Sequence, residues 1–208
     1  DRRQVVATPS VSTLARLRAM PPVAADAPPL LLLSNPELPG PDAASVFVRV
    51  AGAAGLEPVP GAAAEEQALI ELYGRRARWW AGPRATAARL TTDPGPAGAW
   101  RSVHLITHGL FNEERPRYSG LMLSADDTGD GFLDVAEIFG LDLPCDQVVL
   151  SACSSALGKA VDGEGLVGFV QAFLYAGARN VVAALWDVDG DGGARFMRNY
   201  YQRLADRS

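Results

Sequence analysis

Cysteine and histidine are scarce in this chain, which limits the chemistry available to it. The 208 residues contain two cysteines, Cys145 and Cys153, and two histidines, His104 and His108. If residues 147–152 form a strand, the cysteines lie roughly 26 Å apart, since a strand rises about 3.3 Å per residue. A disulfide needs Cα atoms within about 7 Å of each other, so the two cysteines cannot pair inside that strand. Two free thiols fit a reducing, cytoplasmic setting best.

Long hydrophobic runs and an excess of positive charge are also missing. The apolar runs are too short to span a bilayer, and the chain opens with DRRQ rather than with a signal peptide. The net charge of −5 gives no electrostatic reason to expect nucleic acid or an anionic membrane as a partner. Because the chain also lacks an initiator methionine, we expect it to be a piece of a longer protein.

The chain does contain an alternation of apolar strands and amphipathic helices, which predicts an α/β fold with a mainly parallel sheet and helices on both faces. The predicted strands are 30–35, 56–60, 103–109, 147–152 and 180–186, with a hairpin at 120–125 and 131–135. The predicted helices are 12–20, 42–55, 64–76, 163–178 and 192–204. In the helix 64–76, the residues expected on one apolar side are Ala64, Ala68, Ile70 and Leu72. The proline-rich stretch 21–29 separates an N-terminal segment and linker, 1–29, from one domain, 30–208.

Reactive residue types stand where three of the predicted strands end. They are His108, Cys153 and Asp187. Because sites in parallel sheets form at the carboxyl ends of the strands, we expect all three at one edge of the sheet. A cysteine at such a place is either packed as a small hydrophobe or presented to a substrate. The small residues around Cys153 leave room for a peptide, which favours the second interpretation.

A nucleophilic cysteine reacts as its thiolate and needs a base. Both histidines fall on one face of the same predicted strand, because side chains alternate along a strand. His104 is in the middle of that strand and is expected to be a hydrogen-bonded core residue. His108 is at its end, before Gly109. A glycine there lets a substrate approach the backbone, and its N–H can help to hold an oxyanion.

The segments HLITHG (104–109) and VVLSACSSALG (148–158) resemble the caspase-like cysteine peptidases, and more closely the CHAT domain, which is often found beside tetratricopeptide repeats. The similarity continues through GEGLVGFVQAFLYAGARNVVAALWDVDGDG and FMRNYYQRL, and more loosely through ATPSVSTLARLR and LLLLSNPELPG upstream. The resemblance implies a three-layer caspase-hemoglobinase-like fold and peptide-bond hydrolysis by a Cys–His pair. CSS followed by LWDV is also similar to separase, a distant relative.

The matching motifs imply that Cys153 is the nucleophile and His108 the general base or acid. The backbone N–H groups of Gly109 and Cys153 would form the oxyanion hole. In these relatives the two side chains often lie far apart without substrate, so a loose pair is compatible with the role. CHAT domains commonly carry an acidic residue and Thr-Gly just after the cysteine, whereas this chain has Ser154, Ser155 and Ala156. That departure bears on substrate preference rather than on the chemistry.

The acidic loop DVDGDG (187–192) leaves the strand expected next to the cysteine strand. A carboxylate there would pair with a basic substrate side chain. In the separase-like relatives an Asp of the WDV segment is associated with binding arginine. Asp187 is the matching residue here, with Asp189 beside it. The alternative is that Asp187 serves as the N-cap of the last predicted helix.

A second acidic stretch, DDTGDGFLDVAE (126–137), has the spacing of a calcium loop. Asp126, Asp130 and Glu137 take its first, fifth and twelfth positions. An EF-hand also needs a helix before the loop, whereas the preceding RYSGLMLSA is strand-like. We therefore expect a hairpin and a polar turn that caps a short helix, with no cofactor. Calcium binding at these residues is kept as the alternative.

Together these features predict a cysteine endopeptidase, a thiol protease of the CHAT type. It would cut a specific protein or peptide after a basic residue, under the control of an associated domain such as tetratricopeptide repeats. Two alternatives are a catalytically silent CHAT-type interaction module and a calcium-responsive regulatory domain. The presence of both His108 and Cys153 argues against the silent module.

Overall fold

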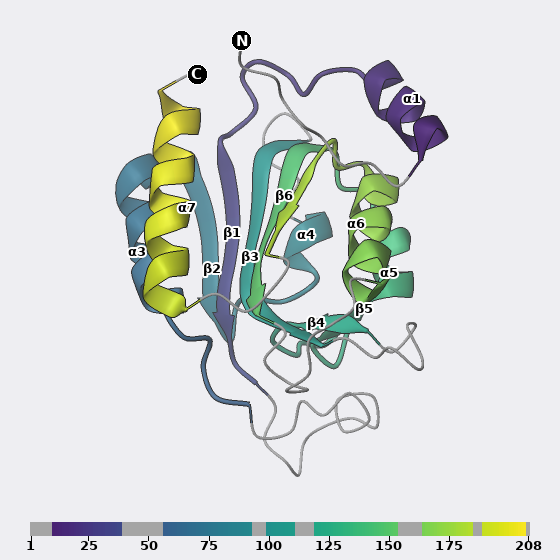
Figure 1. The fold of residues 1–208 in the computed structure, drawn as a ribbon. Coiled ribbons are helices and arrows are strands. Elements are labelled where there is room, and N and C mark those ends of the chain that lie inside the picture. The colour runs from purple at the N-terminus through teal and green to yellow at the C-terminus, as the bar shows by residue number, and fades with distance from the viewer. Residues whose placement is uncertain are drawn as a thin grey trace.

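The computed structural model describes residues 10–38, 56–92, 99–110, 119–153, 164–184 and 189–206, with the side chains of residue 153 and residues 164–167 outside that description. Its centre is a seven-stranded sheet (Figure 1). Five strands are parallel, in the order β2-β1-β3-β6-β7. They span Leu30–Pro36 (β1), Ala77–Gly82 (β2), Trp100–Leu110 (β3), Cys145–Cys153 (β6) and Val181–Ala183 (β7).

A short antiparallel hairpin extends the sheet at the carboxyl end of β3. It consists of β4 (Gly120–Met122) and β5 (Phe132–Asp134), and β4 pairs with the last two residues of β3. The helix α5 (Val135–Phe139) follows at once. The predicted hairpin and short helix are therefore confirmed. In Figure 1 the hairpin lies across the end of the molecule at which the parallel strands finish.

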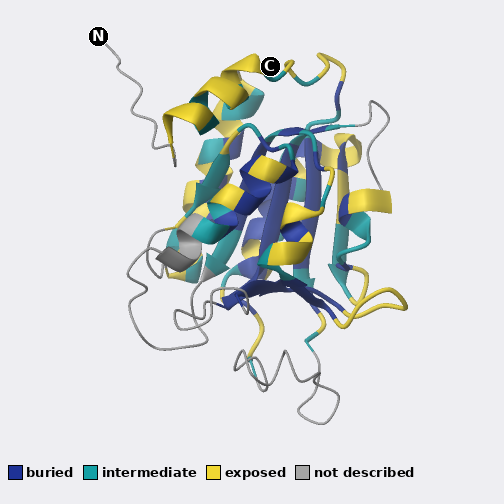
Figure 2. Ribbon diagram, turned by 90° about the vertical axis from the view of Figure 1, so that its right-hand side faces the viewer, coloured by how far each residue is buried: buried dark blue, intermediate teal, exposed yellow. Residues whose placement is uncertain are grey.

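Helices cover both faces of the sheet, which confirms the predicted α/β architecture. One face carries α3 (Ala62–Tyr73) and α7 (Gly190–Ala205), and the other carries α4 (Arg89–Thr92), α5 and α6 (Glu164–Ala176). The strands supply alternate residues to the two cores: Leu30, Leu32, Ile106 and Val149 face α3 and α7, whereas Leu31, Leu33, Val103 and Leu105 face the other layer. Figure 2 shows the strands buried and the outer sides of the helices exposed.

The N-terminal segment begins with α1 (Val11–Ala19), close to the predicted helix 12–20. Ser10 caps it by accepting a hydrogen bond from the N–H of Thr13. The segment is attached to the body of the domain. Arg16 stacks over the Tyr175 ring at 4.9 Å, and Arg179 donates to the carbonyl of Met20 at 2.8 Å.

One predicted strand is wrong. Residues 56–60, predicted as a strand, are not part of the sheet; the second parallel strand is β2 instead. The preceding helix ends at Tyr73 and is followed by a single 3-10 turn, η1 (Gly74–Arg76). β2 is an edge strand with exposed Arg78 and Trp79, so it lacks the apolar run by which the buried strands were recognised. The predicted helix 42–55 lies outside the described residues.

Candidate active site

The backbones of His108 and Cys153 are neighbours at the carboxyl end of the parallel sheet. They are register partners in the β3–β6 ladder and form its last pair. Beyond this point β3 continues for two residues, which pair with β4 instead. His108 therefore marks the end of the parallel sheet. It was predicted to lie at the end of its strand, but β3 continues to Leu110. The Cys153 side chain lies outside the described residues, so the register is what places these two residues together.

The imidazole of His108 is held by a backbone carbonyl. It is 4% exposed, and its Nε2 lies 2.7 Å from the Glu57 carbonyl oxygen. A carbonyl can only accept, so Nε2 carries a proton, and Nδ1 is the basic nitrogen of the neutral ring. Burial lowers the pKa of His108, and the hydrogen bond to Glu57 raises it by a smaller amount. The environment therefore favours the neutral ring, the form that can act as a base.

Gly109, the predicted oxyanion residue, lies inside β3. It is buried and opposite Leu121 of β4. Gly109 thus belongs to a strand, as predicted, and its backbone is fixed by pairing with β4. The oxyanion role of its N–H stays a prediction.

The segment that supplies the Glu57 carbonyl is fixed by a contact between two glycines. It runs from residue 56 into α3, and Gly61 meets Gly190 at the start of α7. A Cβ built on Gly190 would lie 2.6 Å from the carbonyl carbon of Pro60, and one built on Gly61 would lie 2.4 Å from the Gly190 oxygen. Neither position has room for a side chain.

We expect Gly190→Ala to destabilise the fold by about 1–3 kcal/mol, the usual cost of overpacking. It should also slow any reaction that depends on His108, because the segment bearing Glu57 must shift. Gly168→Ala on α6 is the matched control, since a Cβ there meets no atom within 4 Å. Thermal melts and turnover of both variants test this; equal behaviour of the two would contradict the packing argument.

His104, the other histidine, is a core residue, as expected. It is fully buried; its Nδ1 lies 2.9 Å from the Tyr201 hydroxyl, and its Nε2 lies 2.9 Å from Glu65 Oε1. The other oxygen of Glu65 accepts a 2.8 Å hydrogen bond from Ser151 Oγ. This network joins α3, β3, β6 and α7 behind the His108–Cys153 pair.

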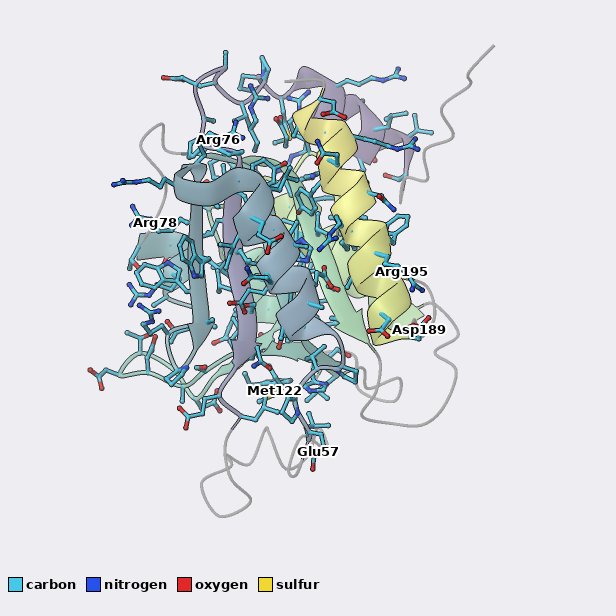
Figure 3. The ribbon with its side chains drawn as sticks, turned by 90° about the vertical axis from the view of Figure 1, so that its left-hand side faces the viewer. Glu57, Arg76, Arg78, Met122, Asp189 and Arg195 are labelled. Carbon is cyan, nitrogen blue, oxygen red and sulfur yellow. The ribbon has the colours of Figure 1, made fainter. Side chains whose placement is uncertain are left out.

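A cavity of about 470 Å³ opens beside this network, at the carboxyl ends of β6 and β7. Its described lining residues are Val59, Pro60, Glu65, Leu150, Ser151, Ala152, Val182, Ala183, Ala184, Asp189, Gly190, Gly193, Phe196 and Met197. Ala152, which lines the cavity, directly precedes Cys153 in β6. Figure 3 shows Glu57 and Asp189 at the same end of the α3–α7 layer.

Of the two predicted substrate-binding carboxylates, the structure describes only Asp189. Asp187 lies outside the described residues. Asp189 is exposed and is the N-cap of α7, where its carboxylate accepts a 2.8 Å hydrogen bond from the N–H of Gly192. Asp189 thus lines the cavity while serving as the helix cap, a role that the sequence analysis considered for Asp187.

The calcium-loop candidates each make local hydrogen bonds. Asp126 accepts from the N–H and hydroxyl of Thr128, which lowers its pKa. Asp130 accepts from the N–H of Phe132, and Glu137 forms a capping box with Asp134 at the start of α5. Within the described part of the chain, no group of three or more His, Cys, Asp or Glu side chains is arranged to hold a metal ion.

Accordingly, Asp134→Ala should cost about 1 kcal/mol of stability through loss of the cap. The loss should be the same with and without millimolar calcium. Melting temperatures of both proteins, with calcium and with a chelator, provide the measurement. A rise with calcium that disappears in Asp134→Ala would support the calcium alternative instead.

Two functional candidates were missed by the sequence analysis. The Glu57 carbonyl carries no side-chain signal at all. Glu65 did leave one: it is spaced three or four residues from Ala62, Ala68 and Leu69, which form the buried side of α3 together with Tyr73. The predicted apolar side was rotated from the true one, because it included the exposed Ala64 and the half-buried Ile70 and Leu72.

Comparison with known proteins agrees with this architecture. The family model of the CHAT domain matches residues 1–208. The chain is 25% identical to mouse Tetratricopeptide repeat protein 28 and 24% identical to its human counterpart, each over 98% of the chain. It spans only 9% of the length of each of these relatives. No described helix is long and apolar enough to cross a membrane.

Proposed function

Because the chain belongs to the CHAT domain family, which is caspase-like, we propose that it is a cysteine endopeptidase with Cys153 as nucleophile and His108 as general base and acid. The observation that carries the proposal is the register of β3 and β6. It puts the two residues side by side at the carboxyl edge of the parallel sheet. Ligand sites of such sheets form at this edge.

The reaction follows from the orientation of the imidazole. With its Nε2 proton bound to the Glu57 carbonyl, His108 takes the thiol proton of Cys153 on Nδ1. The sulfur then attacks the scissile carbonyl carbon, and the N–H groups of Gly109 and Cys153 hold the resulting oxyanion. The imidazolium gives its proton to the leaving amine, and a thioester forms. Water, deprotonated by His108, hydrolyses that thioester and restores the thiol.

We propose further that cleavage follows a basic residue and that a second domain controls it. The basic preference is supported by the two carboxylates that line the cavity beside position 152. Control by tetratricopeptide repeats is suggested by the names of the two curated relatives, of which this chain covers so small a part.

A covalent probe tests the catalytic assignment. Peptides ending in an arginine chloromethyl ketone should label Cys153 and leave Cys145 unmodified. Burial raises the pKa of the Cys145 thiol to about 12, so that thiol is protonated and unreactive at neutral pH. Peptide mapping by mass spectrometry identifies the labelled residue. If Cys153 is never labelled, with or without added repeat domain, the silent interaction module becomes the better interpretation.

A further inference from the structure

The cavity beside position 152 contains a carboxylate that the proposed mechanism does not use. We propose that this residue, Glu65, is the specificity residue of the site and binds the cationic side chain of the substrate residue before the cleaved bond. The inference rests on the proposed peptidase function and adds a binding role for α3, a helix that neither sequence motif nor resemblance had brought into the site.

Glu65 is buried, lines the cavity, and has one carboxylate oxygen without an aligned donor among the described residues. Glu65 is only 4% exposed, yet it is one of the residues that line the cavity. Ser151 donates to Oε2. Among the residues that the structure describes, none aligns a donor with Oε1, although His104 Nε2 lies 2.9 Å from it. A buried acceptor without an aligned donor is costly, and a ligand cation would satisfy it.

The depth of Glu65 matches the length of a basic side chain. Ser151, which holds its carboxylate, is two residues before Cys153 on β6, or roughly 6.6 Å along a strand that rises about 3.3 Å per residue. A substrate whose carbonyl lies at position 153 would therefore need a long side chain to reach Glu65. Extended Lys and Arg side chains have about that reach, whereas Asp does not.

The rest of the lining suits the same ligand. The described lining residues include two carboxylates, Glu65 and Asp189, and no Lys or Arg. Arg195 on α7 is exposed and does not line the cavity. The remaining walls are largely apolar, with Val59, Val182 and Met197 among them. Apolar walls and a carboxylate at the base fit an aliphatic stem that ends in a positive charge.

Of the two carboxylates, Glu65 is the better placed to discriminate. Asp189 is exposed to solvent and already accepts a hydrogen bond as the α7 cap, so water screens its charge. Glu65 is shielded from solvent; Ser151 donates to one of its oxygens, and His104 Nε2 lies 2.9 Å from the other. His104 is in turn fixed by Tyr201, whose pKa burial raises well above its ordinary value, so that its hydroxyl keeps its proton and can donate.

A matched pair of substrates isolates the charge. Citrulline has nearly the shape of arginine but no charge, so the ratio of kcat/KM for Arg and citrulline peptides reports the carboxylate contact alone. Glu65→Gln should lower that ratio about tenfold to a hundredfold, the range expected for a hydrogen bond to a charged group. Turnover of the citrulline peptide by the same variant measures any loss that does not depend on the substrate charge, and the ratio removes that loss from the comparison.

Two control variants remove a charge nearby without touching the base of the cavity. Glu66→Gln changes the next residue of α3, which contacts Ser34 and does not line the cavity. Asp189→Asn keeps a capping side chain and removes the charge at the rim. We expect the Arg-to-citrulline ratio to fall several-fold at most in either control. Melting temperatures show whether each variant is folded, and Glu65→Asp is the substitute should Glu65→Gln unfold.

A binding measurement makes the test independent of turnover. In a Cys153→Ala background, calorimetry compares peptides that end in Arg with those that end in citrulline. Loss of the Arg preference on adding Glu65→Gln supports the role of Glu65. An unchanged preference overturns it, even where Arg substrates are cleaved and the peptidase proposal stands. Absence of any turnover or labelling overturns the peptidase proposal instead, and the binding comparison still decides the role of Glu65.

Discussion

Cys153→Ala should abolish peptide hydrolysis and leave the fold intact. The thiolate is the attacking group, and removing the nucleophile of a protease typically costs far more than 10⁴-fold in turnover. Position 153 is the last residue of β6, where the parallel ladder ends, so we expect the strand pairing to survive truncation there. Turnover of an Arg peptide and a thermal melt of the variant give both parts of the result.

Cys145→Ala is the control for that experiment. Cys145 is at the opposite end of the same strand, fully buried in the core that faces α6. Its loss should lower stability by about 1 kcal/mol, because a small buried group is removed. The rate should not change. Equal loss of turnover in both variants would show that a general weakening of β6, rather than a missing nucleophile, explains the effect.

The sequence predicted the frame of the site better than its surroundings. Buried parallel strands have continuous apolar sequences, so the ends of β3 and β6 could be predicted from the sequence. His108 and Cys153 lie at or near those ends and were placed with them. β2 could not be predicted in this way, since an edge strand is apolar on one side only, and its place was given wrongly to residues 56–60.

Residues 56–60 also show what could not be predicted from the sequence. They contribute to the site through the Glu57 backbone carbonyl, which binds His108, and their position is fixed by the Gly61–Gly190 contact. Neither depends on a chemically distinctive side chain. Glu65 illustrates the intermediate case: its position on the buried side of α3 was readable from spacing, but its partners, Ser151 and His104, come from strands far away in the sequence.

The Glu57 carbonyl and the Glu65 carboxylate belong to one stretch of chain, so we expect the orientation of His108 and the selection of the substrate to be coupled. One stretch of chain, 56–65, supplies both the carbonyl that holds the imidazole and a buried carboxylate that lines the cavity. A ligand bound at Glu65 would therefore press on the same stretch that positions His108. On this argument a correct substrate side chain should affect kcat as well as KM, which the Arg and citrulline peptides can reveal.

His108→Ala is the second change with a large expected effect, a loss of about 10²–10⁴-fold in turnover. That is the range for removing a general acid–base group. The pH dependence makes the assignment specific. Burial lowers the pKa of His108 below its ordinary value of 6.5, and only the neutral ring can accept the thiol proton. The acid limb of kcat/KM should thus fall through a pKa below 6.5, so activity persists at pH values where an exposed histidine is already charged.

The pH dependence of folding stability is an independent measure of the lowered His108 pKa. A histidine whose pKa is lowered by folding is protonated more readily in the unfolded chain. Its neutral form therefore contributes stability that is complete above 6.5 and is lost as the pH falls through the folded pKa. His108→Ala should remove this part of the pH dependence of the melting temperature as well as the acid limb of the rate.

His104→Ala separates catalysis from packing. Removing that ring leaves Glu65 and the Tyr201 hydroxyl without their buried partner, which should cost about 3 kcal/mol, or on the order of 10 °C in melting temperature. The acid limb should keep its pKa, because His108 and the Glu57 carbonyl are unchanged. If the acid limb shifted in His104→Ala and not in His108→Ala, His104 would be the base. The hydrogen bond between Glu57 and His108 would then be only structural.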